Sequence, residues 1–348
     1  MKKHISYPKI QQFRNIVANI SREITFTGLD EDGNAVYDPS IKKPTLTFKG
    51  TVKLHGTNAS VCFNSENGFW IQSRQNIITV ENDNAGFAFF AESRKIQFSS
   101  LLDAIIEENK IDTKIYTISI YGEWAGKGIQ KGVGISQLDK AFYVFGVKIS
   151  NPQDEEFNSY WVDSSNVRSI ENRIFNVEDY KTYYIDVDFN MPQLAQNKFS
   201  EITNEVENEC PISKAFGIEN GLGEGVVWSV EYKGNVHRFK VKGDKHSVTK
   251  VKKLASVDVE KLKSIQEFVE YSVTENRFEQ AVENVFGEED LDVKKMGDFI
   301  RWVVKDIAAE EMDTMVENSL EPKDVNKYIS TKVREMFFKS QNTFINLN

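Results

Sequence analysis

Two kinds of hydrophobic pattern divide the chain near residue 255. Over residues 46–54 the side chains alternate, with apolar Leu46, Phe48, Val52 and Leu54 on one side and polar Thr47, Lys49, Thr51 and Lys53 on the other. This two-residue period is that of a half-buried β-strand. After residue 255 the apolar positions recur every three or four residues, the period of an amphipathic helix. The pattern predicts a sheet-rich region followed by a helical one.

The first region contains further strand signals and one helix signal. Apolar residues at helical spacing predict a helix over residues 10–20, and the polar stretch GLDEDGNAVYDPS predicts an exposed loop or hairpin. Strands are predicted at residues 46–54, 59–63, 69–71, 115–123 and 141–149. Residues 225–243 predict a hairpin that turns around Gly234.

The helical region predicts about four helices, with apolar stripes over residues 259–269, 278–286, 296–307 and 325–337. Gly287 ends the second and Pro322 opens the fourth. We therefore expect an α+β fold with two domains, residues 1–250 and 255–348, and place their boundary within about ten residues of Leu254. The second domain is expected to be small and all-α.

Charge is distributed unevenly between these regions. The net charge is -9, and residues 255–348, with 12 Lys+Arg against 20 Asp+Glu, account for -8 of it. Residues 233–253, by contrast, hold 8 Lys+Arg and the single acid Asp244. A local basic stripe of this kind suits phosphate binding despite the acidic total.

Cysteine content and hydropathy suggest the compartment. Cys62 and Cys210 are too few for a disulfide framework or a metal cluster, and no apolar run approaches the ~20 residues of a membrane span. The N-terminal MKKHISYPKI has no apolar run after its basic residues. We expect a cytoplasmic protein that does not contact membranes.

The first candidate for chemistry is KLHGTN at residues 53–58, at the end of an alternating strand. The spacing K-x-x-G is weak evidence by itself, because it occurs five times in this chain. A solvated lysine on a strand face is the alternative reading of Lys53. The second candidate is YGEWAGKGIQ at residues 121–130, where Glu123 precedes a glycine-rich loop that lets backbone approach a ligand closely.

Two further candidates lie in the predicted hairpin. Glu224 begins the sequence EGVV, and RFKVK follows at residues 238–242. Alternation places Arg238, Lys240 and Lys242 on one face of a strand. Like charges in a row repel unless an anion lies among them, so this face is a candidate anion site.

In chain order these motifs resemble those of the covalent nucleotidyltransferases: K-x-x-G at Lys53, S-R at Arg74, Y-G-E at Glu123, E-G-x-V at Glu224 and K-x-K at Lys240. DNA ligases and capping enzymes usually have Asp-Gly in the first motif, where this chain has HGTN. That version, with GEWAGKGIQ and FYVFGV, is similar to the RNA ligase 2 family of phage and of the mitochondrial RNA-editing ligases. The resemblance covers about residues 45–250. It implies a nucleotidyltransferase domain of ATP-grasp-like antiparallel sheets with helices, followed by the all-α domain.

The resemblance implies a three-step reaction. Lys53 attacks the α-phosphate of ATP, AMP passes to a 5′-phosphate, and a 3′-hydroxyl seals the bond and releases AMP. A lysine nucleophile reacts in its neutral form, which nearby cations favour. Lys240 and Lys242 would supply that charge and offset negative charge on the phosphate. Mg²⁺, which Mn²⁺ can replace, is the expected metal.

The resemblance also implies roles for other residues. Glu123 binds a ribose hydroxyl and Phe145 stacks on adenine. Arg74 contacts the ribose and the RNA end. Glu224 organises the waters of the metal. His55 assists lysine adenylylation or pyrophosphate release, and Asn58 acts afterwards near the 5′-phosphate.

Structural alternatives exist for several of these residues. Phe145 lies on an apolar strand and is suited to the core, and Arg74 is suited to the surface. Asn58 is suited to a turn, and His55 to a buried hydrogen bond.

Several functions fit this sequence. The first is a monomeric ligase sealing nicks in duplex RNA, in the cytoplasm of a bacterial host if a phage encodes it. The others are a ligase of single-stranded RNA or DNA ends, and an inactive nucleotidyltransferase fold that binds RNA. Intact Lys53, Glu123, Glu224, Lys240 and Lys242 argue against the inactive form, because a binding module has no need of a nucleophile.

Overall fold

The computed structural model describes residues 2–153, 159–243, 258–287 and 289–345. The chain forms two compact units that are not continuous in sequence. The first comprises residues 1–16, 46–187 and 195–254, and the second residues 17–45, 188–194 and 255–348. Leu254, where we expect the domain boundary, lies outside the described residues, as do Lys245, Lys250, Lys252 and Lys253 of the predicted basic stripe. Among the helices described here, none has the length and apolar character needed to span a bilayer.

A four-stranded sheet carries the predicted alternating strand. Its order is β11–β3–β12–β13, from Tyr183–Asp188, Thr45–Lys53, Gly225–Tyr232 and Asn235–Lys242. On one face Phe48, Trp228 and Phe239 are fully buried. Phe199 of α4 (Gln196–Asn208) packs edge-on against Trp228 and Phe239, with ring centroids 4.8 and 5.0 Å away. The opposite face presents the polar positions of β3 and β13, as the alternation predicts.

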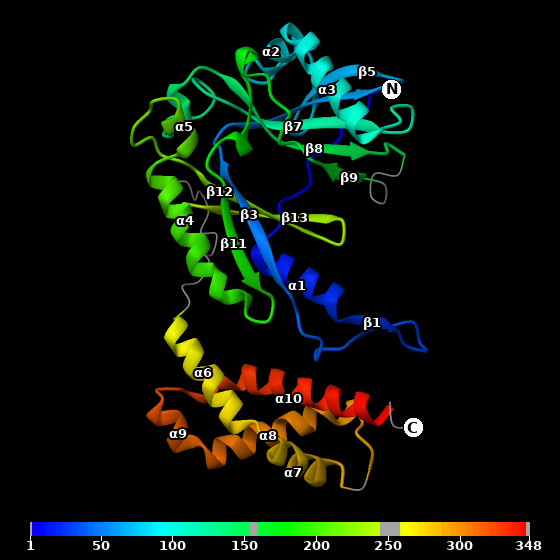
Figure 1. The fold of residues 1–348 in the computed structure, drawn as a ribbon, viewed down its shortest axis with the longest axis vertical. Helices are drawn as coiled ribbons and strands as arrows, with labels where there is room; N and C mark the ends of the chain where they lie inside the picture. Colours follow the sequence, from blue (N-terminus) through cyan, green and yellow to red (C-terminus); the bar gives the residue numbers. More distant parts are fainter. Residues whose placement is uncertain (1, 154–158, 244–257, 288, 346–348) are drawn as a thin grey trace. The chain divides into compact units, whose positions relative to one another are not determined.

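The first unit also contains a seven-stranded sheet (Figure 1). Its main order is β10–β8–β7–β4–β5–β6, and β9 also pairs with β8. In that order the strands are Ile174–Asn176, Ala141–Ser150, Thr117–Ala125, Thr57–Asn64, Gly68–Ser73 and Ile77–Ile78, with β9 at Ser159–Val162. Helices α2 (Phe87–Ser93) and α3 (Lys95–Asn109) bury Phe87, Phe98 and Leu102 in one core with residues of this sheet.

Strand β8 is interrupted by a bulge. Tyr121 of β7 pairs with Gly146, but the next residue, Gly122, pairs with Val144. Phe145 is therefore an extra residue in β8, and it is only half-buried where its neighbours are buried. A bulge re-aims the side chain it carries. Val144 and Val147, on either side of the bulge, belong to the apolar core, whereas Phe145 lies outside it.

The other described elements before the tail are two helices, a hairpin and short 3-10 turns. Helix α1 covers Phe13–Thr25, so the helix predicted at residues 10–20 is confirmed with a later start. The polar stretch after it forms the hairpin of β1 (Phe26–Leu29) and β2 (Ala35–Tyr37). Helix α5 covers Pro211–Ala215, and short 3-10 turns lie at Gly134–Gln137, Ile170–Asn172, Val177–Asp179 and Pro192–Ala195.

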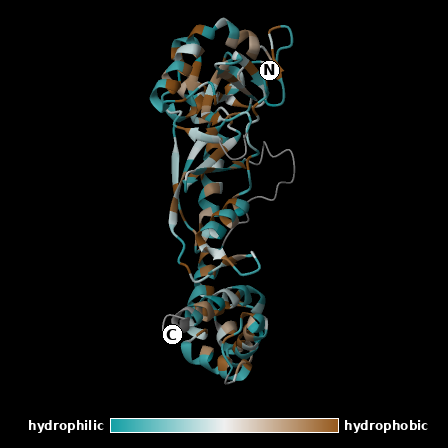
Figure 2. Ribbon diagram, turned by 90° about the vertical axis from the view of Figure 1, so that its right-hand side faces the viewer, coloured by the Kyte–Doolittle hydropathy of each residue, from teal (hydrophilic) through white to brown (hydrophobic). Residues whose placement is uncertain are grey.

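The tail is helical, as predicted. Its helices are α6 (Val259–Ser272), α7 (Glu275–Val285), α8 (Met296–Glu310), α9 (Met312–Glu317) and α10 (Pro322–Ile345), and a 3-10 turn at Val293–Lys295 immediately precedes α8. The four predicted stripes lie on α6, α7, α8 and α10, whereas α9 was not predicted. Figure 2 shows hydrophobic and hydrophilic residues following one another along these helices, and Phe299 and Phe337 lie fully buried in their core.

Candidate active site

The charges of the site converge on one buried carboxylate. Glu224 is 2% exposed and lies immediately before β12. Its Oε2 accepts a hydrogen bond from Lys53 Nζ at 2.5 Å, and its Oε1 lies 2.6 Å from Lys242 Nζ. Burial raises the pKa of Glu224, but Lys53 and Lys242 more than offset that effect and hold the pKa below its usual value. The carboxylate is therefore ionised and paired with two cations.

Sheet register explains why these two lysines flank one acid. Gly225 pairs with Lys53 on β3 and with Lys242 on β13, so the three residues lie in one row across the sheet. A Cβ on Gly225 would collide with the carbonyl oxygen of Val241, and its φ of +149° also disfavours other residues. Glycine here lets the strands close around Glu224.

Lys240 adds a third cation to the same sheet face. It pairs with Val227, two residues along the strand from Lys242. Burial first, and then the charges of Lys53 and Lys242, hold its pKa below the usual value. The pocket thus concentrates positive charge, and an anionic ligand would reduce the repulsion between the lysines.

The turn after Lys53 connects this sheet to the larger one. His55 Nδ1 lies 3.4 Å from Glu224 Oε2, and Gly56 N donates a 2.9 Å hydrogen bond to Glu123 Oε1. Asn58 pairs with Glu123 across β4 and β7. Burial raises the pKa of Glu123 to about 7, with Lys53 opposing and Glu224 reinforcing the shift.

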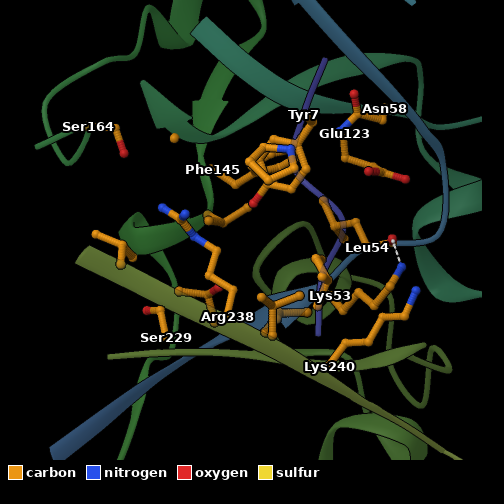
Figure 3. A pocket seen from close by; sticks show the side chains of 18 of the residues that line it. Tyr7, Lys53, Leu54, Asn58, Glu123, Phe145, Ser164, Ser229, Arg238 and Lys240 are labelled. Carbon is orange, nitrogen blue, oxygen red and sulfur yellow. Dashed lines mark hydrogen bonds between the residues drawn. The ribbon is translucent and has the colours of Figure 1, made fainter. Parts of the chain in front are cut away.

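All nine residues predicted for the site line one pocket of about 830 Å³ in the first unit. They are Lys53, His55, Asn58, Arg74, Glu123, Phe145, Glu224, Lys240 and Lys242. Figure 3 shows Lys53 and Lys240 on one side of this pocket, with Phe145, Asn58 and Glu123 on the other. Arg74 follows β5 and is exposed. The functional roles implied for these residues remain predictions.

Tyr7, Trp161 and Arg238 also line this pocket, and the sequence indicated neither of the two aromatic residues. Arg238 was noted only as one of three strand cations. The Tyr7 ring lies edge-on to Phe145 and Trp161, with centroids 5.2 and 5.5 Å away. Tyr7 belongs to no helix or strand, so no periodic pattern marks it.

The side chains of the pocket suit a metal ion that is bound partly by the protein and partly by the phosphate groups of a ligand. Among the described residues, no group of three or more His, Cys, Asp or Glu side chains could hold an ion by itself. Mg²⁺ commonly uses one or two carboxylates together with substrate phosphates and waters. Glu224 could supply one carboxylate in such a set once a nucleotide provides phosphate oxygens.

Comparison with known proteins identifies the family. A family model described as RNA ligase matches residues 47–242, more than half of the chain. The chain belongs to the RNA ligase family. The match includes all nine predicted residues of the pocket, from Lys53 to Lys242, where it ends.

Solved structures similar to this chain include a Naegleria gruberi RNA ligase with PPi, at 15% identity and a TM-score of 0.41. A mutant of that ligase with ATP and Mn gives 15% identity and a TM-score of 0.42. Each alignment covers 70% of this chain and 57% of the other, so this chain matches little more than half of their length. No curated protein sequence matches the chain.

Proposed function

We propose that this RNA ligase family member uses ATP to join 3′-hydroxyl and 5′-phosphate ends through AMP carried on Lys53. The observation that supports this most directly is the buried Glu224 carboxylate held between Lys53 and Lys242 at the wall of an 830 Å³ pocket. That volume lies within the range of small-molecule sites.

In the first step Lys53 Nζ forms a bond to the α-phosphorus of ATP, and the bond to pyrophosphate breaks. The attacking amine must be neutral, so the proton that ties Nζ to Glu224 has to leave first. Lys240 and Lys242 lie beside Lys53 and offset the negative charge of the phosphate as the bonds change. Mg²⁺, or Mn²⁺ in its place, would neutralise the oxygens of the departing pyrophosphate, with Glu224 holding it through water.

The opposite wall is suited to the nucleoside. Phe145 is turned out of β8 by the bulge and offers a ring on which a base can stack. Glu123 can accept a hydrogen bond from a ribose hydroxyl, and Arg74 lies close enough to it to affect its pKa. These placements hold the α-phosphate toward Lys53.

Two further steps complete the reaction. AMP passes from Lys53 to the 5′-phosphate of one strand, and the 3′-hydroxyl of the other then attacks that phosphate and releases AMP. Asn58 and Arg74 are proposed to contact the 5′-phosphate end. We also propose that the enzyme acts as a monomer.

A nick in duplex RNA is the proposed substrate, on the resemblance to RNA ligase 2. The test compares sealing of a nicked RNA duplex, single-stranded RNA with a 5′-phosphate, and a nicked DNA duplex of the same sequence. We expect the nicked RNA duplex to be sealed fastest, and Asn58→Ala to carry AMP yet seal slowly. Faster sealing of either other substrate would overturn the duplex-RNA assignment, and parent-rate sealing by Asn58→Ala would overturn the role of Asn58.

A further inference from the structure

Arg238 lines the pocket at some distance from Lys242. Arg238 lies on the same face of β13 as Lys240 and Lys242, four residues from Lys242, which is about 13 Å along a strand. Its Cζ lies 3.8 Å from the centre of the Trp161 ring. Figure 3 shows the guanidinium below the Tyr7 and Phe145 rings. Arg238 is thus fixed by stacking rather than by an acid.

The N–H groups of the Arg238 guanidinium have no hydrogen-bond acceptor among the described residues. Within the described ranges its side chain donates no hydrogen bond and forms no ion pair, although its backbone carbonyl accepts one from Gln11 N. An arginine has five N–H donors and no acceptor, and half-buried donors of this kind normally have partners. Burial holds its pKa below the usual value, with Tyr7 opposing that shift. Trp161 covers one face of the group, so its edge remains available to a ligand in the pocket.

The neighbours of Arg238 indicate which part of a ligand it meets. A Cβ on Gly146 would lie 4.0 Å from Arg238 Nη2 and 2.9 Å from the Trp161 ring, so only glycine fits beside them. Gly146 adjoins Phe145, the ring proposed to stack on the base. Tyr7, which packs edge-on against Phe145 and Trp161, lies close enough to Arg238 for the two to affect each other's pKa. The arginine edge therefore borders the plane in which a stacked base would lie.

We propose that Arg238 is a specificity-determining residue, which donates a hydrogen bond to a ring nitrogen of the purine stacked on Phe145. The proposal rests on the proposed function, because it takes the stacked ligand to be ATP. Adenine presents ring-nitrogen acceptors beside its N6 amino donor. The hydroxyl of Tyr7 can accept as well as donate, so it is suited to the amino group.

The test measures equilibrium binding of ATP and of its 1-deaza, 3-deaza and 7-deaza analogues by calorimetry, without divalent metal. The full-length parent and Arg238→Ala are compared. A hydrogen bond from a charged donor corresponds to about tenfold or more in affinity. We expect Arg238→Ala to bind ATP about tenfold more weakly. We also expect one analogue to bind the parent about tenfold more weakly than ATP does, with no such difference in Arg238→Ala.

Arg94→Ala is the matched control. Arg94 also stacks on an aromatic ring, with its Cζ 4.2 Å from the centre of Phe90, and it does not line the pocket. Its loss should leave ATP binding at the parent value. Equal penalties for every analogue in the parent and in Arg238→Ala would overturn the proposal, as would parent-like ATP binding by Arg238→Ala.

Intact mass after incubation with ATP and Mg²⁺ separates this proposal from the proposed function. A parent protein that shows the analogue pattern but never gains AMP would contradict ligation while leaving the role of Arg238 in place. A parent that gains AMP on Lys53 but binds all analogues alike would contradict only the role of Arg238.

Discussion

Glu224 illustrates how a single side chain sets the electrostatics of the pocket. A buried carboxylate is costly unless it is paired, and removal of one partner of such a group is usually strongly destabilising. Both oxygens of Glu224 are engaged, one by Lys53 and one by Lys242. In the proposed reaction, release of Lys53 for attack would leave Glu224 with one cation fewer, and a bound metal would supply the missing positive charge.

Glu123 gives a prediction on pH. Its pKa is about 7 in the folded protein against an ordinary 4.5, so the folded state holds this proton more tightly than the unfolded chain does. The contribution of this group to the stability of the fold is therefore complete below pH 4.5 and is lost as the pH rises toward 7. Between about pH 5 and about pH 8, we expect the free energy of unfolding of the parent to fall by about 2–3 kcal/mol more than that of Glu123→Gln.

Urea unfolding of both proteins at about pH 5 and about pH 8 measures this difference. Other groups titrate in both proteins alike, so only the difference between them reports on Glu123. The same change with pH in parent and variant would contradict a raised pKa at this carboxyl.

At the scale of elements, the turn between β3 and β4 determines where the nucleophile lies. Gly56 follows Lys53 by three residues, and its amide is bonded to Glu123 of β7. A Cβ on Gly56 would collide with the carbonyl oxygen of Trp124 and lie 2.9 Å from Glu123 Cγ. The contact with the backbone of β7 cannot be relieved by rotating a side chain.

We therefore expect Gly56→Ala to lower the free energy of unfolding by about 1–3 kcal/mol, as overpacking does, and to slow adenylylation at least tenfold. Gly297→Ala is the matched control. Gly297 lies in α8 with nothing within 4 Å of an added Cβ, so the change should be neutral or stabilise by up to about 1 kcal/mol. Thermal unfolding and AMP loading measure both variants. Parent-like behaviour of Gly56→Ala would show that the turn is not tightly fitted.

Alternation was sufficient to predict which face of each strand would be polar. It placed Thr51 and Lys53 of β3 opposite Phe48 and Val52, and the burial of these residues confirms it. It could not predict that Gly225 would pair with Lys53, because β3 and β12 lie about 170 residues apart and their register depends on the assembled sheet.

Features without a local pattern were not predictable. The bulge at Phe145 arises from the pairing of β8 with β7, and an alternating sequence does not reveal an extra residue. Tyr7 reaches the pocket from an irregular segment, and its contacts are with residues more than 100 positions away. Motif resemblance identified Phe145 despite the bulge, but it gave no information on Tyr7 or on the stacking of Arg238 over Trp161.

At the scale of the whole molecule, the pocket belongs to one of the two units. All residues that line it lie within residues 1–16, 46–187 and 195–254. The helical tail has its own core, and Arg277 joins α7 to α8 through ion pairs of 2.8 Å with Asp306 and 2.7 Å with Glu310. We therefore propose that the adenylylation step depends on the first unit alone.

We expect a chain ending at residue 254 to gain AMP on Lys53 at a rate within about threefold of the full chain. The net charge of -8 on residues 255–348 makes broad phosphate contact by the tail unfavourable, so its removal should not weaken ATP binding. Intact mass over time, with circular dichroism to confirm folding, measures this. A folded truncated chain that gains no AMP would show that residues 255–348 contribute to the first step.

The most direct test of the central claim is the intact mass of the purified protein after incubation with Mg²⁺ and ATP, GTP or NAD in turn. The account predicts one AMP increment with ATP alone, mapping to Lys53, and none in a folded Lys53→Ala variant. No increment on folded parent protein purified free of AMP, or a normal increment in Lys53→Ala, would contradict it.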